Sequence, residues 1–342
     1  MIRKGMHCGS GKNSKLRYYV GCLWREAVPG VWLRWRLKRV LARARRRKDW
    51  VYIERRVNYY CRLNAPVVLS ADSPRLGEHT RKGMNSVYYF DTKEFTRWFD
   101  PELRWRVCPG DVTYVPEWPA VVKSRPIATE GEGGWANACS VLLNLNKIRH
   151  FIFLKDRIPF RRKLDRAIFR GDVNRTTKPH RVRFMERYFG SEVCDCGIIS
   201  SAGDCPQEWM RPKISLWEHL KYKFVMTLEG NDVASNLKWV MSSNSLAVMP
   251  RPKYETWFME GTLVPGYHYV EIRDDFSDLP EKMAYYAAHP EEAERIAAHA
   301  HEYIAQFRNK RRERIISLLV LEKYFRMTGQ LTPETTERSA GR

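Results

Sequence analysis

The sequence lacks several patterns that assign a protein to a class at once. No uninterrupted apolar run is long enough to span a bilayer, and residues 1–21 carry charges without an apolar stretch of signal-peptide length. Neither a GxGxxG motif nor a Walker lysine motif occurs, which argues against a dinucleotide or P-loop site. The eight cysteines include no CxxC pair and no Cys/His ladder. We therefore expect no metal site, and we expect the thiols to be reduced.

Acidic residues are few compared with basic ones. The chain of 342 residues has 60 Lys and Arg against 39 Asp and Glu, a formal net charge of +21. An excess of this size predicts attraction to a polyanion such as nucleic acid, an anionic membrane face or an acidic glycolipid. The length and the 44% of hydrophobic residues are sufficient for two domains with their own cores.

Much of the positive charge lies in residues 31–62, which are predicted to form one or two helices. Trp32 and Trp35 alternate there with a dense set of arginines. A basic helix with tryptophans can lie on anionic lipid. It can equally be a solvated face whose aromatic residues pack on the first domain. A nucleic-acid-binding arm is a third interpretation, with no motif around it to support it.

Residues 219–250 are predicted to form a strand, a loop, a helix and a second strand. The first strand is Phe224 to Leu228, and the loop begins at Gly230. The helix contains Leu237, Val240 and Met241 and is expected to be capped by Asp232 or Ser235, and the second strand is Leu246 to Met249. A loop of Gly, Asn, Asp and Ser before a helix is a candidate phosphate cradle. The alternative is an ordinary α/β packing unit that binds nothing.

The first half of the chain also shows an alternating α/β pattern. We expect strands at 86–90 and 112–115, with a helix at 92–99 capped at Asp91 or Thr92. Asp111 and Glu117 flank the second strand, and loops at strand ends in open α/β sheets are where ligands gather. The alternative is that Asp111 caps a turn and Glu117 is solvated.

The second half begins near a basic stretch at 161–163. The apolar run 151–154 before it is predicted to be the last strand of the first domain. The segment 169–177 should form a loop at a strand end before a helix at 179–188, and its arginines and threonines are good phosphate or carboxylate ligands. Pro290 fits the first position of a further helix, and residues 311–326 continue as a helix.

Three groups of residues, in this order along the chain, resemble the motifs of glycosyltransferase family 90. They are Phe169-Arg170-Gly171 with Arg175-Thr176, the 219–248 segment with Ala234-Ser235 and Lys238, and Trp257 with His268-Tyr269-Val270 and Asp275 to Leu279. The family includes protein O-glucosyltransferases, fungal capsule-associated xylosyltransferases and bacterial lipopolysaccharide A proteins. This chain has Asn236 where the eukaryotic members carry an arginine.

The resemblance implies a GT-B-like α/β fold, in which two Rossmann-like domains face a cleft and a C-terminal helix packs back on the first domain. The expected parts are a basic helical segment at 1–62, an acceptor-side domain at 63–160, a nucleotide-sugar-binding domain at 161–310 and a C-terminal helix and tail at 311–342.

The implied activity is transfer of a sugar from a UDP-sugar to a hydroxyl of a lipopolysaccharide or related glycan, with inversion and without a metal or other cofactor. The partners are then the UDP-sugar, the glycan or glycolipid and an anionic membrane surface, with no specific nucleic acid. The chain also ends in ERSAGR, which is not an ER-retention signal. We expect a cytoplasmic location, with peripheral attachment to the inner face of the cytoplasmic membrane as a further option.

The resemblance also assigns site residues. The expected nucleotide-sugar ligands are Arg170, Gly171, Arg175, Thr176, Lys223, Gly230, Ala234, Ser235, Asn236 and Lys238. Glu117 aligns with the catalytic aspartate of the eukaryotic enzymes, so we prefer it over Asp111 as the catalytic base. The competing function is that of a non-catalytic polyanion-binding protein, for which the net charge and the arginine-rich helix are the whole case.

Overall fold

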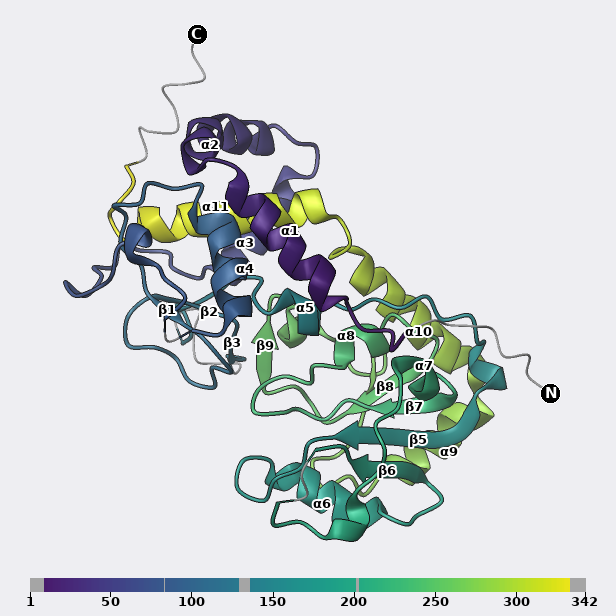
Figure 1. Cartoon of the computed structure of the whole chain (residues 1–342). Helices are drawn as coiled ribbons and strands as arrows, with labels where there is room; N and C mark the ends of the chain where they lie inside the picture. Colours follow the sequence, from purple (N-terminus) through teal and green to yellow (C-terminus); the bar gives the residue numbers. More distant parts are fainter. Residues whose placement is uncertain (1–8, 83, 129–135, 201–202, 333–342) are drawn as a thin grey trace. The chain divides into compact units, whose positions relative to one another are not determined.

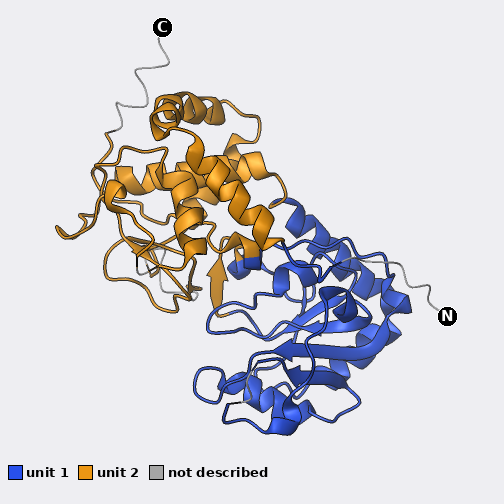
Figure 2. Ribbon diagram, in the orientation of Figure 1, with its two compact units in different colours: residues 1–13, 149–252, 260–306 blue, residues 14–148, 253–259, 307–342 orange. Residues whose placement is uncertain are grey.

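The chain forms two compact units in a computed structural model that describes residues 9–82, 84–128, 136–200 and 203–332 (Figure 2). Unit 1 consists of Met1–Asn13, Arg149–Pro252 and Glu260–Gln306. Unit 2 consists of Ser14–Ile148, Lys253–Met259 and Phe307–Arg342. Each unit is therefore built from separate stretches of chain, and the expected division at 1–62, 63–160, 161–310 and 311–342 stays a prediction.

Unit 1 contains a five-stranded sheet in which every strand pairing is parallel. Figure 1 shows β8, β7, β5 and β6 next to one another in that order, with β10 beyond β8 in the sheet. The strands are β5 (Leu164–Gly171), β6 (Cys194–Ile198), β7 (Tyr222–Met226), β8 (Leu246–Met249) and β10 (Val270–Glu271). A mixed α/β fold with a parallel sheet was expected, and this part of the prediction is confirmed.

The order of these strands reverses once. The chain runs from β5 outward to β6, then returns past β5 to β7 and continues through β8 to β10. β5 pairs with β7 through Ala167 opposite Phe224 and Ile168 opposite Val225. In open parallel sheets, ligands bind beyond the carboxyl ends of the strands at the point of such a reversal. We therefore expect a ligand site at the loops that follow β5 and β7.

Apolar helix faces cover this sheet. The α-helices of unit 1 are α6 (Pro179–Tyr188), α7 (Leu216–His219), α8 (Leu237–Val240), α9 (Leu279–Ala288) and α10 (Pro290–Ala305), with short 3₁₀ helices at Phe160–Arg162, Gln207–Trp209 and Glu260–Thr262. Phe184 of α6 is fully buried and makes edge contacts with Phe169, at 5.4 Å between ring centroids, and with Phe276, at 5.2 Å. Burying one such ring stabilises the fold by about 1.5–3 kcal/mol.

Several elements of unit 1 lie where the sequence placed them. α6 covers the predicted range 179–188, β8 covers 246–249, and α10 begins at Pro290. Both α6 and α10 carry proline in the first turn, where its missing N–H costs no helical hydrogen bond. The predicted cap of the helix after Gly230 is wrong, because Asn236, rather than Asp232 or Ser235, stands at the N-cap of α8.

Unit 2 combines helices with two small sheets. Its helices are α1 (Lys15–Ala27), α2 (Gly30–Arg45), α3 (Trp50–Tyr60), α4 (Ser86–Thr96) and α11 (Lys310–Met327), with a 3₁₀ helix at Leu76–Glu78, and α5 (Lys147–His150) straddles the boundary with unit 1. The strands β1 (Val107–Cys108), β2 (Ala120–Val122) and β4 (Ser140–Leu142) form a parallel sheet in the order β1-β2-β4. β3 (Ser124–Pro126) pairs antiparallel with β9 (Tyr254–Thr256). One or two helices were predicted within 31–62, and the structure has two there, α2 and α3.

A buried charged cluster ties α11 to α3 in unit 2. Arg56 and Glu313 form a bidentate ion pair, with Nη1–Oε1 at 2.6 Å and Nη2–Oε2 at 2.9 Å. The indole N–H of Trp257 donates to the same carboxylate at 2.6 Å, and the Trp257 ring stacks on Tyr60 at 3.8 Å between centroids. The C-terminal helix and the short segment 253–259 are thus held against helices from the N-terminal half of the chain.

The strand predicted at 86–90 is wrong, because these residues begin α4. The Asn85 side chain accepts a hydrogen bond from the backbone N–H of Val87 at 3.0 Å and caps the helix, so the expected cap at Asp91 or Thr92 is also wrong. The buried residues Tyr88, Thr92 and Phe95 follow helical spacing. Aromatic residues favour strands as a class, which made a run of them misleading here.

Two further predicted strands are absent from the described residues. Val112 to Val115 form no strand, and Val112 is held instead by the Ser124 hydroxyl, which bonds its N–H at 3.1 Å and its carbonyl at 3.0 Å. Phe151 to Leu154 also form no strand, and the Leu154 N–H donates to the Ser242 hydroxyl at 2.8 Å. In each segment a serine hydroxyl thus bonds backbone groups of one residue in place of a sheet neighbour.

One histidine of unit 2 is held in an apolar site. His79 lies between the rings of Tyr89 and Trp105, and its Nε2 lies 2.8 Å from the Thr92 hydroxyl. Burial, with a smaller contribution from Lys93, lowers the pKa of His79 to about 4. The folded protein therefore holds this imidazole neutral at every pH above that value.

None of the helices within the described residues combines the length and the apolar composition that a bilayer crossing requires.

Candidate functional site

The candidate site lies in unit 1, where the loops after β5 and β7 leave the carboxyl ends of the sheet. β5 ends at Gly171 and β7 ends at Met226, and the two strands are neighbours. The loop after β5 leads into α6, so the N-terminus of this ten-residue helix lies at the same end of the sheet. The N-terminal end of a helix carries partial positive charge and favours anions.

Arg181, in the first turn of α6, connects the two loops. Its Nη1 donates to the carbonyl of Asp172 at 2.7 Å, in the loop after β5. Its Nη2 donates to the carbonyl of Leu228 and its Nε to that of Glu229, both at 2.8 Å, in the loop after β7. We call these three hydrogen bonds the Arg181 fork. A planar guanidinium holds its N–H donors in fixed directions, an arrangement that a lysine cannot reproduce. Arg181 therefore fixes the spacing of the two loops.

The charge on Arg181 is only partly compensated. Within the described residues it forms no ion pair, since its three hydrogen bonds all go to backbone carbonyls. Burial lowers the pKa of Arg181 to about 10; the carboxylate of Asp172 opposes this effect and the nearby Arg149 adds to it. The group stays charged at neutral pH. The site thus presents a half-buried cation beside a helix N-terminus.

The loop after β5 is braced by its own side chains. The Asn174 carboxamide oxygen accepts hydrogen bonds from the backbone N–H groups of Thr176 and Thr177, at 3.0 and 2.8 Å. Lys178 Nζ donates to the Asp172 carboxylate at 2.8 Å, and that carboxylate also accepts a bond from Ser200. Asp172 keeps a lowered pKa, because these hydrogen bonds and the nearby cations outweigh the opposing effect of its burial.

Hydrogen bonds also stabilise the loop after β7. The Gly230 N–H donates to the Asp232 carbonyl at 2.9 Å, and the Asn236 side chain donates to the carbonyl of Met226 at 2.9 Å. Cβ atoms built at Gly171 and Gly230 would lie 3.4 and 3.7 Å from the Arg181 guanidinium. The fold therefore brings two of the expected ligands, Gly171 and Gly230, together around Arg181.

All four of the expected cationic ligands already have carboxylate partners inside unit 1. Arg170 donates to the Asp195 carboxylate at 2.6 Å, and Tyr222 donates to the same carboxylate at 2.7 Å. Two other cations are themselves buried and pair with carboxylates: Lys223 pairs with the exposed Asp165, and Lys238 with the buried Glu260. Lys223 lies in the first half of β7, toward the end of the sheet opposite Gly171 and Gly230.

The remaining expected ligands lie around the two loops. Arg175 is exposed, pairs with Glu186 at 3.4 Å, and donates to the carbonyl of Asp204 at 3.3 Å. Thr176 is exposed on the loop after β5. In the loop after β7, Ala234 is buried and Ser235 is half-buried. The helix that follows them, α8, has only four residues, so the ten-residue α6 supplies the larger dipole at this end of the sheet.

Sequence reasoning missed Arg181. The resemblance pointed to Arg170 and Arg175, on either side of the loop after β5, whereas Arg181 lies within the helix that follows. A signal was available, because Arg181 is the third residue of a helix that opens with Pro179 directly after a predicted ligand loop. Position N3 faces the same end of the sheet as the loop.

The two expected catalytic carboxylates belong to unit 2 and differ in their environment. Glu117 is exposed in the connection between β1 and β2, and within the described residues its carboxylate makes no hydrogen bond or ion pair. Asp111 forms an ion pair with Lys123, whose side chain is almost fully buried at the end of β2. Asp111 therefore acts in part as the counterion of a buried cation, and Glu117 is the carboxylate without such a partner.

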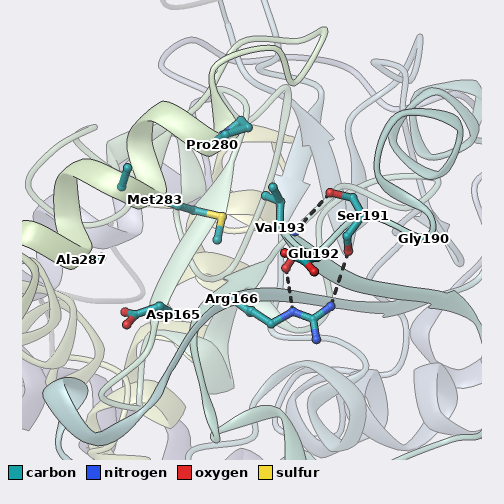
Figure 3. Close-up of a pocket in the computed structure, with 10 residues that line it drawn as sticks. Asp165, Arg166, Gly190, Ser191, Glu192, Val193, Pro280, Met283 and Ala287 are labelled. Atoms are coloured by element: carbon teal, nitrogen blue, oxygen red, sulfur yellow. Dashed lines mark hydrogen bonds between the residues drawn. The ribbon is translucent and has the colours of Figure 1, made fainter.

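A cavity of about 650 Å³ lies elsewhere in unit 1 (Figure 3). It opens near the N-terminal ends of β5 and β6, where Arg166 Nε donates to the carbonyl of Glu192 at 2.8 Å. Pro280 and Met283 of α9 form its apolar wall. This cavity is at the end of the sheet opposite Arg181, so it does not coincide with the candidate site.

No metal-binding group accompanies these carboxylates in the part of the chain that the structure describes. Nowhere in that part do three or more His, Cys, Asp or Glu side chains come together in an arrangement that could hold an ion. The expectation of a metal-independent reaction stays a prediction.

Comparison with known proteins places the chain among glycosyltransferases. A sequence profile described as "Glycosyl transferase family 90" matches residues 141–327. The chain is 40% identical over 313 residues to "O-glucosyltransferase LpsA" of Dichelobacter nodosus, an alignment that covers 91% of this chain and 95% of that protein. It is also 30% identical over 139 residues to the human "Protein O-glucosyltransferase 3", covering 40% of this chain and 27% of the human protein.

Proposed function

This chain belongs to glycosyl transferase family 90 and is a glycosyltransferase, and from that premise we propose that it transfers glucose from UDP-glucose to a hydroxyl of a lipopolysaccharide or related glycan. The word glucosyltransferase in the relatives' names supports the choice of sugar. The single observation that carries the donor site is the Arg181 fork at the strand-order reversal of unit 1.

In this proposal unit 1 is the donor-binding domain of a GT-B enzyme. The diphosphate of UDP lies at the carboxyl ends of β5 and β7, next to Gly171 and Gly230. The N-terminus of α6 and the charge of Arg181 then face the diphosphate. Arg175 is the second expected phosphate contact, and it must release Glu186 to make it.

The proposed chemistry needs one base and no metal. Glu117 accepts the proton of the acceptor hydroxyl, whose oxygen forms a bond to the anomeric carbon of the sugar. The bond between that carbon and the β-phosphate oxygen breaks, and UDP departs with the electron pair. Attack on the face opposite the departing UDP inverts the anomeric configuration. Arg181 stabilises the negative charge that develops on the diphosphate.

The acceptor is proposed from charge and from the printed name of a relative. A net charge of +21 favours an anionic acceptor such as a phosphorylated lipopolysaccharide core. The relative that aligns over 95% of its length is called LpsA. We place the reaction in the cytoplasm, at the inner face of the membrane where a lipid-linked acceptor is exposed. A purely non-catalytic polyanion-binding role is set aside, because the chain is a member of an enzyme family.

Nucleotide selectivity tests the donor proposal. UDP should raise the unfolding temperature of the protein more than GDP, CMP or inorganic phosphate at equal concentration, since ligand binding to the folded state stabilises it. Arg183, an exposed arginine on α6, provides the matched control, because Arg183→Ala should leave this shift intact. Equal shifts from all four compounds would contradict a uridine-specific site.

A further inference from the structure

Exposed apolar side chains are concentrated on two neighbouring helices of unit 2. Among the described residues, seventeen large hydrophobic side chains are exposed, and eight of them lie between residues 16 and 35. This stretch covers α1, the connection at Val28 and the first part of α2. Contiguous exposed apolar surface on a folded protein marks a site that contacts something other than water.

On α1 the exposed apolar residues form a stripe. Leu16, Val20, Leu23 and Trp24 are spaced four, three and one residues apart, so they share one face of the helix, and they are 56–78% exposed. The opposite side holds α1 to α4, since Cys22 is buried and the Tyr18 hydroxyl donates to Asp91 at 2.8 Å. α1 thus presents its apolar face to solvent while its other face is packed.

On α2 the outward face combines tryptophan with arginine. Trp32 and Trp35 are 65% and 70% exposed, and the exposed Arg36, Arg39 and Arg43 continue the same face at helical spacing. The Arg39 guanidinium lies over the Trp35 ring at 4.9 Å. The buried residues of this helix, Leu41 and Ala44, lie on its other side. α2 contains no acidic residue, which a helix with an ordinary solvated face usually carries.

The positive charge around this surface indicates which class of partner it binds. Residues 15–48 contain twelve Lys and Arg and a single acidic residue, Glu26. Cationic side chains bind the anionic headgroups of a bilayer, and tryptophan prefers the boundary between headgroups and acyl chains. Nucleic acid explains the cations but leaves the aliphatic stripe on α1 without a role. The combination of stripe, tryptophans and cations fits a lipid surface best.

We propose that α1 and α2 form a docking surface for an anionic lipid bilayer. The stripe Leu16, Val20, Leu23 and Trp24 and the tryptophans Trp32 and Trp35 enter the headgroup region, and the arginines of α2 contact lipid phosphates. The inference rests on the proposed function only for the location of the acceptor. It names a surface on α1, which the sequence pattern of the basic helix did not identify.

Vesicle flotation of the full chain tests the proposal without any sugar donor or acceptor. The protein should float with vesicles of phosphatidylcholine and phosphatidylglycerol at 50 mM salt, and much less with phosphatidylcholine alone or at 500 mM salt, because the Debye length falls from roughly 14 Å to about 4 Å. Replacing Arg36, Arg39 and Arg43 by glutamine should weaken partitioning roughly 100-fold.

Two further variants distinguish binding through α1 and α2 from non-specific binding through any exposed apolar group. The variant with Trp24, Trp32 and Trp35 all replaced by alanine should lose binding to the anionic vesicles. The control with Val68→Ser and Val264→Ser, which removes exposed apolar groups elsewhere, should keep it. Circular dichroism checks that each variant is folded.

Three outcomes overturn the proposal. They are equal binding to neutral vesicles, full binding by the tryptophan variant, and binding to single-stranded RNA without binding to anionic vesicles. Sugar transfer to a soluble acceptor, measured without vesicles, tests the proposed function separately, so a failure of either can be told from a failure of the other.

Discussion

Replacing Arg181 by alanine removes three hydrogen bonds from a charged donor to backbone carbonyls. Each such bond contributes about 1.5–3 kcal/mol when it is well shielded from water. Arg181 is only half-buried and water can replace part of what is lost, so we expect the free energy of unfolding to fall by about 2–4 kcal/mol in total. Direct contact with the diphosphate predicts in addition a loss of about 1.5–3 kcal/mol in UDP binding, roughly 10- to 100-fold in Kd.

Isothermal titration of UDP into each folded variant measures the second effect, and thermal unfolding measures the first. Arg183→Ala is the matched control, since it removes the same charge from an exposed position on the same helix. Arg181→Lys keeps the charge but loses the fork that spans two loops. Its affinity for UDP should fall between those of the wild type and Arg181→Ala.

Arg181 does not contact the diphosphate if folded Arg181→Ala binds UDP as tightly as the wild type. The same conclusion follows if Arg183→Ala and Arg181→Ala weaken binding equally, because the effect would then come from net charge alone. Should Arg181→Ala not fold, the comparison of Arg181→Lys with the wild type still decides the question.

Three other predictions follow from the structure. Glu313→Gln should lower the free energy of unfolding by about 3–5 kcal/mol in denaturant titrations, because it leaves a buried arginine without its carboxylate; a loss under about 1 kcal/mol would mean that the buried pair is not formed. The unfolded chain binds a proton at His79 near pH 6.5 and the folded chain only near pH 4, so stability should fall by about 2–3 kcal/mol as the pH drops through this window, and His79→Asn should remove that part of the pH dependence. Glu117→Gln should lower kcat about 10²–10⁴-fold with unchanged stability, whereas Asp111→Asn should mainly reduce stability by unpairing Lys123, and the reverse pattern would make Asp111 the base.

The elements that the sequence predicted well are those with local signals. The helix at Pro179 and the one at Pro290 were marked by proline in the first turn, and β8 by a short apolar run that Pro250 closes. Such signals act within a few residues, so they survive whatever the rest of the chain does. The α/β class followed from their alternation.

The errors came from partners that lie far away in the sequence. Ser86 to Phe90 has strand-like composition, yet the distant contact of Asp91 with Tyr18 of α1 favours a helix. The cap at Asn85 is a local signal for the same helix, and the run of aromatic residues obscured it. Val112 is held by a hydroxyl twelve residues away rather than by a strand neighbour. Single-residue propensities cannot anticipate these contacts, because tertiary packing overrides them.

The candidate site, too, could be predicted from local signals only in part. The glycine positions at the ends of β5 and β7 could be found from the pattern of strand and loop. The residue that joins the two loops could not, since its role depends on β5 and β7 being neighbours although more than 50 residues separate them. The charged residues Lys223 and Lys238 matched the family pattern, but only the fold shows that Asp165 and Glu260 pair with them.

The most direct test of the central claim is a mass-spectrometric assay of nucleotide-sugar turnover. The purified chain is incubated with UDP-glucose, GDP-mannose and CMP-sialic acid, with no added metal and with a chelator, and the release of each free nucleotide is followed. The proposed function predicts that UDP appears from UDP-glucose, by transfer or by slow hydrolysis, and that Glu117→Gln slows its release about 10²–10⁴-fold. Release of GDP or CMP in place of UDP would contradict it.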